Sequence, residues 1–307
     1  MLRLETKNAV YPRDVREMIW KVQASRHGQP AGKGTPLPVL LAESISPGAK
    51  ELLRNERIGY FDSGGSLFLP APGAYIFIDK PAPKPFVKSI RNLFAGRRAQ
   101  VLHVLLVRCV DWFGVHELAQ EALVSPATAS QVLTELEHFD WMELRGQGPS
   151  KERRLREPAA LLNEWVQQLE NTRPPALRRY YIPNTKADLL AAKIGQVCEV
   201  HNVLYAITHE AAAQRYAPFL SSISQVRARV LMSSSADAAL GDLAAREVNE
   251  GANFVVIEAK SPGEMLFRER MDDLWLASRI QIYLDLVRGE GRSKEMAAHF
   301  RTAKIGF

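Results

Sequence analysis

The chain has 307 residues, 46% hydrophobic and 24% charged, an ordinary globular composition with room for two or three domains. Its net charge of +6 is too small to indicate a nucleic-acid partner unless the basic residues cluster. The first residues lack the apolar core of a signal peptide, and no apolar stretch approaches the length of a membrane span. We therefore expect a cytoplasmic protein with no membrane partner.

Residues 1–83 are predicted to form a small α+β domain. Helical spacing and capping residues predict helices over residues 14–26 and 46–57. Residues 28–38 are typical of a loop, and the proline-rich residues 79–85 predict a linker that ends the domain. A hairpin turn is expected at Gly64 and Gly65. The expected strands cover residues 39–42, 59–62, 66–69 and 74–78.

Residues 84–172 carry the pattern of a winged helix-turn-helix. A turn separates the second helix from a third one that begins at Ser125-Pro126, and a glycine-rich tip joins two short strands. A further helix over residues 159–169 and a boundary at residues 171–179 follow. The expected helices and strands of the pattern are residues 98–110, 115–121, 126–137, 141–144 and 153–155.

The third helix of this pattern has one apolar and one polar face. Ser125 is suited to cap it, and Pro126 fits its first position, where a missing N–H costs nothing. Ala129, Val132, Leu133 and Leu136 recur at helical spacing and predict the buried face. Short hydrogen-bonding residues on the other side suit a helix that approaches base edges in the major groove. The residues predicted to contact DNA here are Ser125, Thr128, Ser130, Gln131 and Thr134.

Basic residues border this segment on both sides. Five lie between Lys84 and Arg98 with no acidic residue, and five lie between Arg145 and Arg156 with only Glu152. Such clusters are placed to neutralise phosphates, although they are also typical of solvated faces. Lys88 and Arg91 would add charge near the DNA backbone. The basic residues predicted to bind DNA are Arg97, Arg98, Arg145, Lys151, Arg153 and Arg154.

Residues 173–307 are predicted to form a C-terminal α/β domain with a regulatory or interaction role. Its expected strands are residues 203–207, 226–232 and 254–257. Its expected helices are residues 187–197, 209–216, 236–246, 271–288 and 293–301. The whole chain is thus predicted to be α+β, with a central winged helix-turn-helix between two flanking domains.

The segment VHELAQEALVSPATASQVLTELEHFDWMELRGQGPSKERRLREP resembles bacterial winged-helix transcriptional regulators. With GYFDSGGSLFL before it and YAITHEAAAQRYAPFL and NFVVIEA after it, the arrangement is similar to the AbiEi-family antitoxin/regulators of type IV toxin–antitoxin systems. The resemblance implies DNA binding and repression of a cognate promoter. Many such regulators start directly with the winged helix, whereas here a domain precedes it.

Enzyme motifs are weak in this sequence. Glu258-Ala-Lys260 after an apolar strand is half of a metal-dependent nuclease pattern, but Asp237 and Asp242 lie in a predicted helix rather than at a strand end. Asp62 before a hairpin is similar to a nuclease-like core without its catalytic partners, and a turn or capping role is the simpler interpretation. The histidines show no metal-ligand spacing.

Cys109 and Cys198 lie far apart in apolar helical contexts, typical of buried thiols. We expect no catalytic residue, metal or cofactor. The prediction is a sequence-specific regulator of double-stranded DNA, a repressor, with homodimer formation left open. Two alternatives also stay open, namely a DNA-processing protein with a nuclease-like domain and a protein-interaction scaffold that uses the winged helix without nucleic acid.

Overall fold

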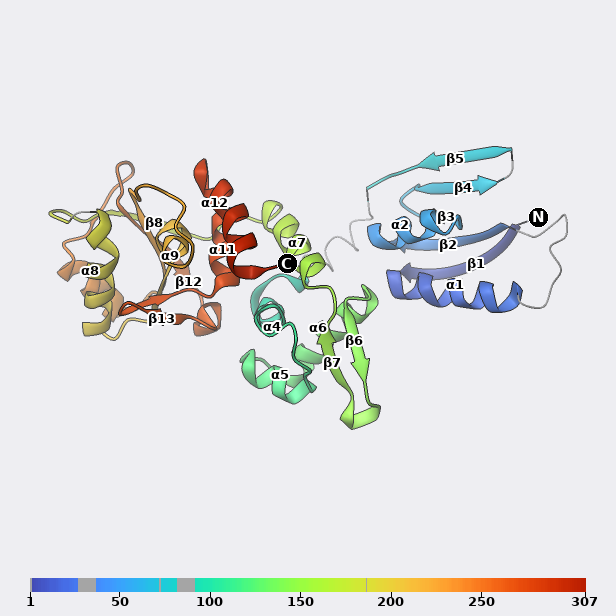
Figure 1. Ribbon diagram of the computed structural model, residues 1–307, viewed down its shortest axis with the longest axis horizontal. Coiled ribbons are helices and arrows are strands. Elements are labelled where there is room, and N and C mark those ends of the chain that lie inside the picture. Colours follow the sequence, from blue (N-terminus) through green and yellow to red (C-terminus); the bar gives the residue numbers. More distant parts are fainter. Residues whose placement is uncertain (1, 27–36, 72, 82–91, 186) are drawn as a thin grey trace. The chain divides into compact units, whose positions relative to one another are not determined.

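The computed structural model describes the chain except for residues 1, 27–36, 72, 82–91 and 186 (Figure 1). The protein is a mixed α+β fold, as predicted. Its residues gather into two compact units. The first contains residues Met1–Ala99, Cys109–Ala119 and Ser125–Glu157. The second contains residues Gln100–Arg108, Gln120–Val124 and Pro158–Phe307.

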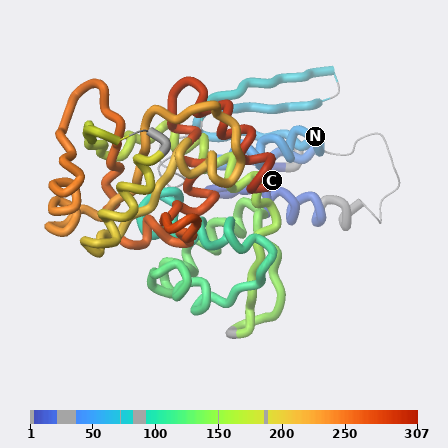
Figure 2. The backbone as a smooth tube through the Cα atoms, turned by 60° about the vertical axis from the view of Figure 1, so that its left-hand side comes forward, coloured from blue at the N-terminus to red at the C-terminus, as the bar shows by residue number. Residues whose placement is uncertain are grey.

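A five-stranded sheet in the order β1-β2-β3-β4-β5 begins the first unit. The first three strands are parallel and the last two antiparallel, and β4 and β5 run side by side in both views (Figure 2). Helices α1 (Pro12–Arg26) and α2 (Pro47–Asn55) connect the parallel strands and contact each other. Right-handed crossovers place both helices on one face of the sheet. The strands are β1 (Leu2–Val10), β2 (Leu37–Ile45), β3 (Gly59–Asp62), β4 (Leu67–Ala71) and β5 (Ala74–Ile78).

Most of the predicted N-terminal elements are confirmed, with two differences. Ser46 caps α2 by accepting the Ala49 N–H at 3.2 Å, and Gly65 adopts a φ of 90° in the predicted hairpin turn. The strand β1 was not predicted, because its polar and charged residues hide the alternation that marks a strand. The predicted loop lies partly outside the described residues, and β2 begins earlier than expected, at Leu37.

The middle of the chain contains three helices followed by a two-stranded antiparallel hairpin. Each element lies within a few residues of its predicted position, and the helix after the hairpin is confirmed as well. The elements are α4 (Gly96–Val107), α5 (Val115–Glu121), α6 (Pro126–His138), β6 (Met142–Arg145), the 3-10 turn Gly148–Ser150, β7 (Glu152–Leu155) and α7 (Pro158–Glu170).

The second unit is built around a seven-stranded mixed sheet in the order β11-β8-β12-β10-β9-β14-β13. On β10, Val230 faces α10 and α8 whereas Arg229 faces α11, so helices cover both faces of this sheet. The strands are β8 (Leu177–Tyr181), β9 (Tyr205–Thr208), β10 (Val226–Leu231), β11 (Arg246–Glu247), β12 (Phe254–Ala259), β13 (Glu269–Met271) and β14 (Leu274–Leu276). The helices are α8 (Ala187–Val200), α9 (His209–Tyr216), α10 (Ser234–Asp242), α11 (Arg279–Val287), α12 (Arg292–Phe300), a 3-10 turn (Pro262–Met265) and a π-helical turn (Arg301–Ile305).

One C-terminal prediction is wrong. The helix predicted from residue 271 begins only at Arg279, after Ser278 caps it, and the preceding residues form the β13–β14 hairpin. Asp272 and Asp273 both have positive φ in its turn, a conformation that aspartate tolerates better than most residues. The boundary predicted at residues 171–179 already contains the start of β8. In the described part of the chain, no helix combines the length and the apolar character needed to cross a membrane.

Candidate nucleic-acid interface

Helix α6 is fixed by its cap and by its apolar face. Ser125 Oγ accepts the Thr128 N–H at 3.2 Å and lies 3.0 Å from Thr128 Oγ1. The predicted buried face is confirmed, because its four residues are fully buried. Gln131 and Thr134 are consequently exposed, and Thr128 and Ser130 are half-buried. The exposed side of the helix therefore offers hydroxyl and amide groups but carries no Lys or Arg.

A guanidinium group from α4 supplies the charge that the exposed side of α6 lacks. Arg98 Nη2 donates a hydrogen bond to Gln131 Oε1 over 3.1 Å, and the neighbouring Arg97 is exposed. This bond joins residues 33 positions apart, so sequence reasoning placed both residues at DNA but did not pair them. With its oxygen engaged, Gln131 keeps its Nε2 group as a hydrogen-bond donor.

The β6–β7 hairpin is tied to the segment between α4 and α5. The Phe113 N–H donates to Arg153 O at 2.8 Å, and the Arg153 N–H donates back to Phe113 O at 3.0 Å. This isolated bridge adds a third short extended segment beside β7, and the Phe113 side chain is fully buried. Strand β7 is thus held at Arg153 by a residue that precedes α5.

The buried carboxylate of Glu137 gathers the basic residues predicted at the hairpin tip. Arg153 Nε donates to Glu137 Oε1 at 2.6 Å, and Lys151 Nζ lies 3.0 and 3.1 Å from its two oxygens. Burial raises the pKa of Glu137, but the hydrogen bonds from Arg153 and Lys151 prevail and hold that pKa below its ordinary value. Arg153 is only 8% exposed, which contradicts its predicted contact with phosphate. Lys151 remains partly exposed beside it.

Trp112 organises the outer arginines of the hairpin. The guanidinium carbons of Arg145 and Arg154 lie 4.5 and 4.8 Å from the centre of its ring. Each arginine also pairs with a carboxylate of the opposite strand, Arg145 with Glu152 and Arg154 with Glu143. Cation–π contacts of this kind hold long side chains in place. Sequence reasoning missed Trp112, because it precedes α5 in the sequence and only the fold brings it beside the hairpin.

The positive charge of the hairpin is largely balanced by nearby carboxylates. Arg156 pairs with Asp140, and all five basic residues from Arg145 to Arg156 thereby have acidic partners. Five carboxylates face these five basic groups, and Arg13 and Arg16 of α1 also pair with two of them, Glu137 and Asp140. The acidic partners are Glu137, Asp140, Glu143, Glu152 and Glu157. Exposed pairs contribute little to stability, so phosphate can compete for the arginines, but the carboxylates stay close. The predicted Lys84, Lys88 and Arg91 lie outside the described residues.

No match was found between this chain and any family model, curated protein or solved structure.

The residues of the nuclease alternative have other partners. Glu258 accepts a hydrogen bond from Arg178 Nε, and His201 Nε2 lies 2.7 Å from Asp242. Asp62 is fully buried, with Lys50 Nζ at 2.9 Å, and it closes the hairpin turn by accepting the Ser66 N–H. In the described part of the chain, no three His, Cys, Asp or Glu side chains gather as a metal site.

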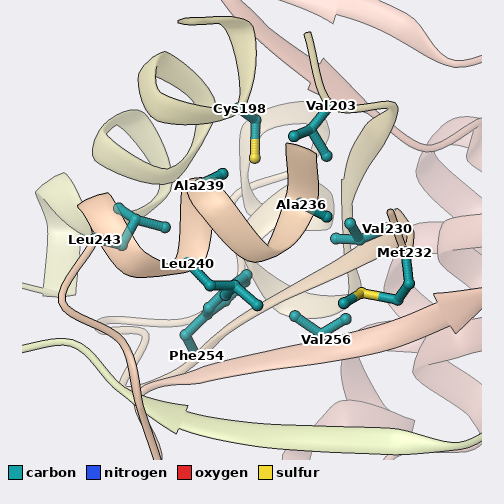
Figure 3. Close-up of a pocket in the computed structure, with 10 residues that line it drawn as sticks. All are labelled: Cys198, Val203, Val230, Met232, Ala236, Ala239, Leu240, Leu243, Phe254 and Val256. Carbon is teal, nitrogen blue, oxygen red and sulfur yellow. The ribbon is translucent and has the colours of Figure 1, made fainter. Parts of the chain in front are cut away.

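A small apolar cavity lies under α10 in the second unit (Figure 3). Cys198, Ala239, Val230 and Phe254 are among the side chains that line its volume of about 10 Å³. Such a volume holds at most one water, and its lining offers no polar partners. Burial raises the pKa of Cys198 to about 12, so its thiol stays protonated. The cavity is a packing gap, and Cys198 is the buried thiol that the sequence predicted.

Proposed function

We propose that this protein is a sequence-specific, duplex-DNA-binding transcriptional regulator, in which residues 84–172 act as a winged helix-turn-helix. The order of three helices and a hairpin supports this proposal, as do the Ser125 cap and the Phe113 bridge. Repression of a promoter and an antitoxin-like role follow from the resemblance to AbiEi-family proteins. Cytoplasmic localisation belongs to the same proposal.

The observation that carries the proposal is the Arg98–Gln131 pair on the exposed side of α6. In the major groove, guanidinium groups bind guanine and glutamine amides bind adenine. The pair presents both kinds of donor on a helix whose neighbouring Thr134 and Thr128 are short enough to permit close approach. Base choice is therefore assigned to Gln131 and Arg98.

Affinity is assigned to the flanking charges. Arg97 lies beside Arg98, and Arg145 and Arg154 are held against Trp112 where phosphate can replace their carboxylate partners. Lys151 contributes from its partly exposed position. Arg153 acts by holding the hairpin to Glu137 and not by touching DNA.

The test begins with selection of bound duplexes from a random pool at a stated salt concentration. Gln131→Ala should weaken binding by about 1–3 kcal/mol and relax base preference at one position of the selected duplex. Gln167→Ala, at an exposed glutamine of α7, is the matched control and should leave both properties unchanged. Failure to enrich any sequence would contradict sequence-specific binding.

Phosphate contact is tested by the salt dependence of affinity. Arg154→Ala should lower the slope of log K against log salt by about one. Arg178→Ala is its control, because Arg178 is 42% exposed and paired with Glu258, much as Arg154 is 37% exposed and paired with Glu143. Equal effects of the two substitutions would show that the hairpin has no special place in binding.

The protein-interaction scaffold remains a second candidate, favoured by the near balance of charge on the hairpin. It predicts that the folded wild-type protein binds no duplex even at low salt. Measurable, salt-dependent duplex binding would dismiss it.

A further inference from the structure

The five-stranded sheet of the first unit has one face covered by helices and one face open. Tyr60 and Phe68 are buried in the core with residues of α1 and α2. Their strand neighbours Phe61 and Leu67, which pair with each other, therefore point to the opposite face. Tyr75 and Phe77 contact Phe68 and belong to the helix-covered side.

On the open face, β2 to β5 carry apolar side chains, and β1 carries Leu4 together with the polar Thr6, which pairs with Leu41. Val39, the partner of Leu4, lies on the same face and is 6% exposed. Leu4 is 59% exposed, Phe61 44%, Ile76 40% and Ile78 43%. Strand register aligns these residues across the sheet, since Leu4 lies on the same side as Leu41, and Leu41 pairs with Phe61. We define the open face as Leu4, Leu41, Phe61, Leu67, Leu69, Ile76 and Ile78. Strands that are apolar on both sides are typical of sheets covered on both faces.

The size of the open face matches that of a dimer interface. Five strands about 4.8 Å apart, at roughly 3.3 Å per residue, give a flat area of about 400–500 Å² per copy. Two copies would bury about 800–1,000 Å² in all, at the low end for a specific interface. Single exposed apolar residues need no explanation, but a contiguous patch of this extent indicates a binding surface.

The charge of the open face favours a second copy of this chain as its occupant. Among the described residues of this face, Glu43 is charged but lies beyond Leu41 near the end of β2. Two such faces therefore meet without bringing like charges together at their centre. Stacked sheets pack about 10 Å apart with strands crossing at about 30°, so apolar side chains of both copies interdigitate.

We propose that the open face is the interface of a homodimer in which two N-terminal sheets pack face to face. This inference is independent of DNA binding, because it rests only on the first sheet. The dimer buries the apolar side chains that a single copy leaves in water.

The decisive experiment compares two substitutions on one strand. Ile76→Asp places a charge on the open face, and Tyr75→Asp places it on the other side at a residue that is 73% exposed. Sedimentation equilibrium of the full chain should give a dimer for the wild type and for Tyr75→Asp. Ile76→Asp should raise the dimer dissociation constant roughly 100-fold or more, because a buried unpaired carboxylate is strongly disfavoured.

Circular dichroism and thermal melting must show that both variants remain folded. As a second measurement, Phe61→Cys should allow disulfide cross-linking of the dimer, whereas Tyr75→Cys should not. A monomeric wild type across the micromolar range would overturn the proposal and leave the face to a different partner. Equal dissociation by both Asp variants would also overturn it, since pairing along the β5 edge would then explain the dimer better.

Discussion

Ion pairs of the same chemistry lie in opposite surroundings in the two units. In the second unit, Arg229 and Asp285 are 10% and 5% exposed, and Asp285 also accepts hydrogen bonds from Thr208 and Gln281. On the β6–β7 hairpin, Arg145 and Glu152 are 53% and 37% exposed. This difference in exposure distinguishes ion pairs that the fold requires from ion pairs whose partners a ligand can replace.

Solvent is the physical reason for this separation. A buried ion left without its partner keeps its full desolvation cost, whereas an exposed one is rehydrated. The Glu137 cluster lies between the two cases, because its carboxylate is 7% exposed while Lys151 beside it is 31% exposed. The following predictions test this order, from the deepest pair to the most exposed.

The largest effect is expected for Asp285→Ala. It leaves the buried Arg229 guanidinium with only the partly exposed Glu264, 3.7 Å away, as a charged partner, so the free energy of unfolding should fall by about 3–5 kcal/mol. Chemical denaturation followed by circular dichroism measures it. Glu152→Ala, which breaks an exposed pair, is the control and should cost under about 1 kcal/mol. Similar losses in the two variants would remove the distinction between buried and exposed pairs.

As the pH is lowered, the buried region of the second unit should lose stability at a higher pH than the β6–β7 hairpin does. Burial, with a smaller contribution from the Arg229 charge, lowers the pKa of His103 to about 4. The folded state holds this imidazole neutral. The contribution of His103 to the free energy of unfolding is therefore fully present above the unfolded pKa near 6.5, and it is lost as the pH falls toward 4. The expected loss for His103 is on the order of 3 kcal/mol over that range.

Unfolding free energies measured from pH 7 to pH 4 provide the test. His103→Gln keeps a hydrogen-bonding group near Ser278 and should flatten the profile. Burial also lowers the pKa of His209 to about 4, so part of the slope should remain in that variant. An unchanged profile would mean that His103 does not titrate in this range.

An intermediate effect is expected for Glu137→Gln. Arg153 would lose its charged partner while remaining buried, so stability should fall by about 1–3 kcal/mol. Glu143→Gln, on the exposed Arg154 pair, is the control and should change stability by less than about 0.5 kcal/mol. Equal stability of the two variants would show that the buried Arg153–Glu137 pair contributes no more to stability than the exposed Arg154–Glu143 pair.

Sequence reasoning succeeded wherever structure depends on neighbours along the chain. The Ser125 cap involves residues three positions apart, and the buried face of α6 follows from helical spacing alone. Failures occurred where local signals conflict with pairing partners. Strand β1 is recognisable mainly by its pairing with β2, and Asp272 and Asp273 form a turn without the glycine that usually marks one.

The candidate interface was predictable in location but not in charge. Counting basic residues along residues 145–156 suggested a strongly positive hairpin. Glu137 lies 16 residues from Arg153 and Glu143 lies 11 from Arg154, so their neutralising effect appears only when α6 and the two strands come together. A buried arginine and an exposed one also look alike in sequence.

The smallest effect on stability should accompany a gain in DNA binding. Glu152→Gln removes the carboxylate that holds Arg145 and should change the free energy of unfolding by less than about 0.5 kcal/mol. If Arg145 meets phosphate, the substitution should tighten duplex binding several-fold and steepen the salt dependence by up to about one. Fluorescence anisotropy across a salt series measures both quantities.

Glu258→Gln frees Arg178 in the same way far along the chain and should leave binding unchanged. Weaker binding by Glu152→Gln would mean that the pair orients Arg145 for DNA instead of competing with it, and the hairpin carboxylates would then belong to the interface.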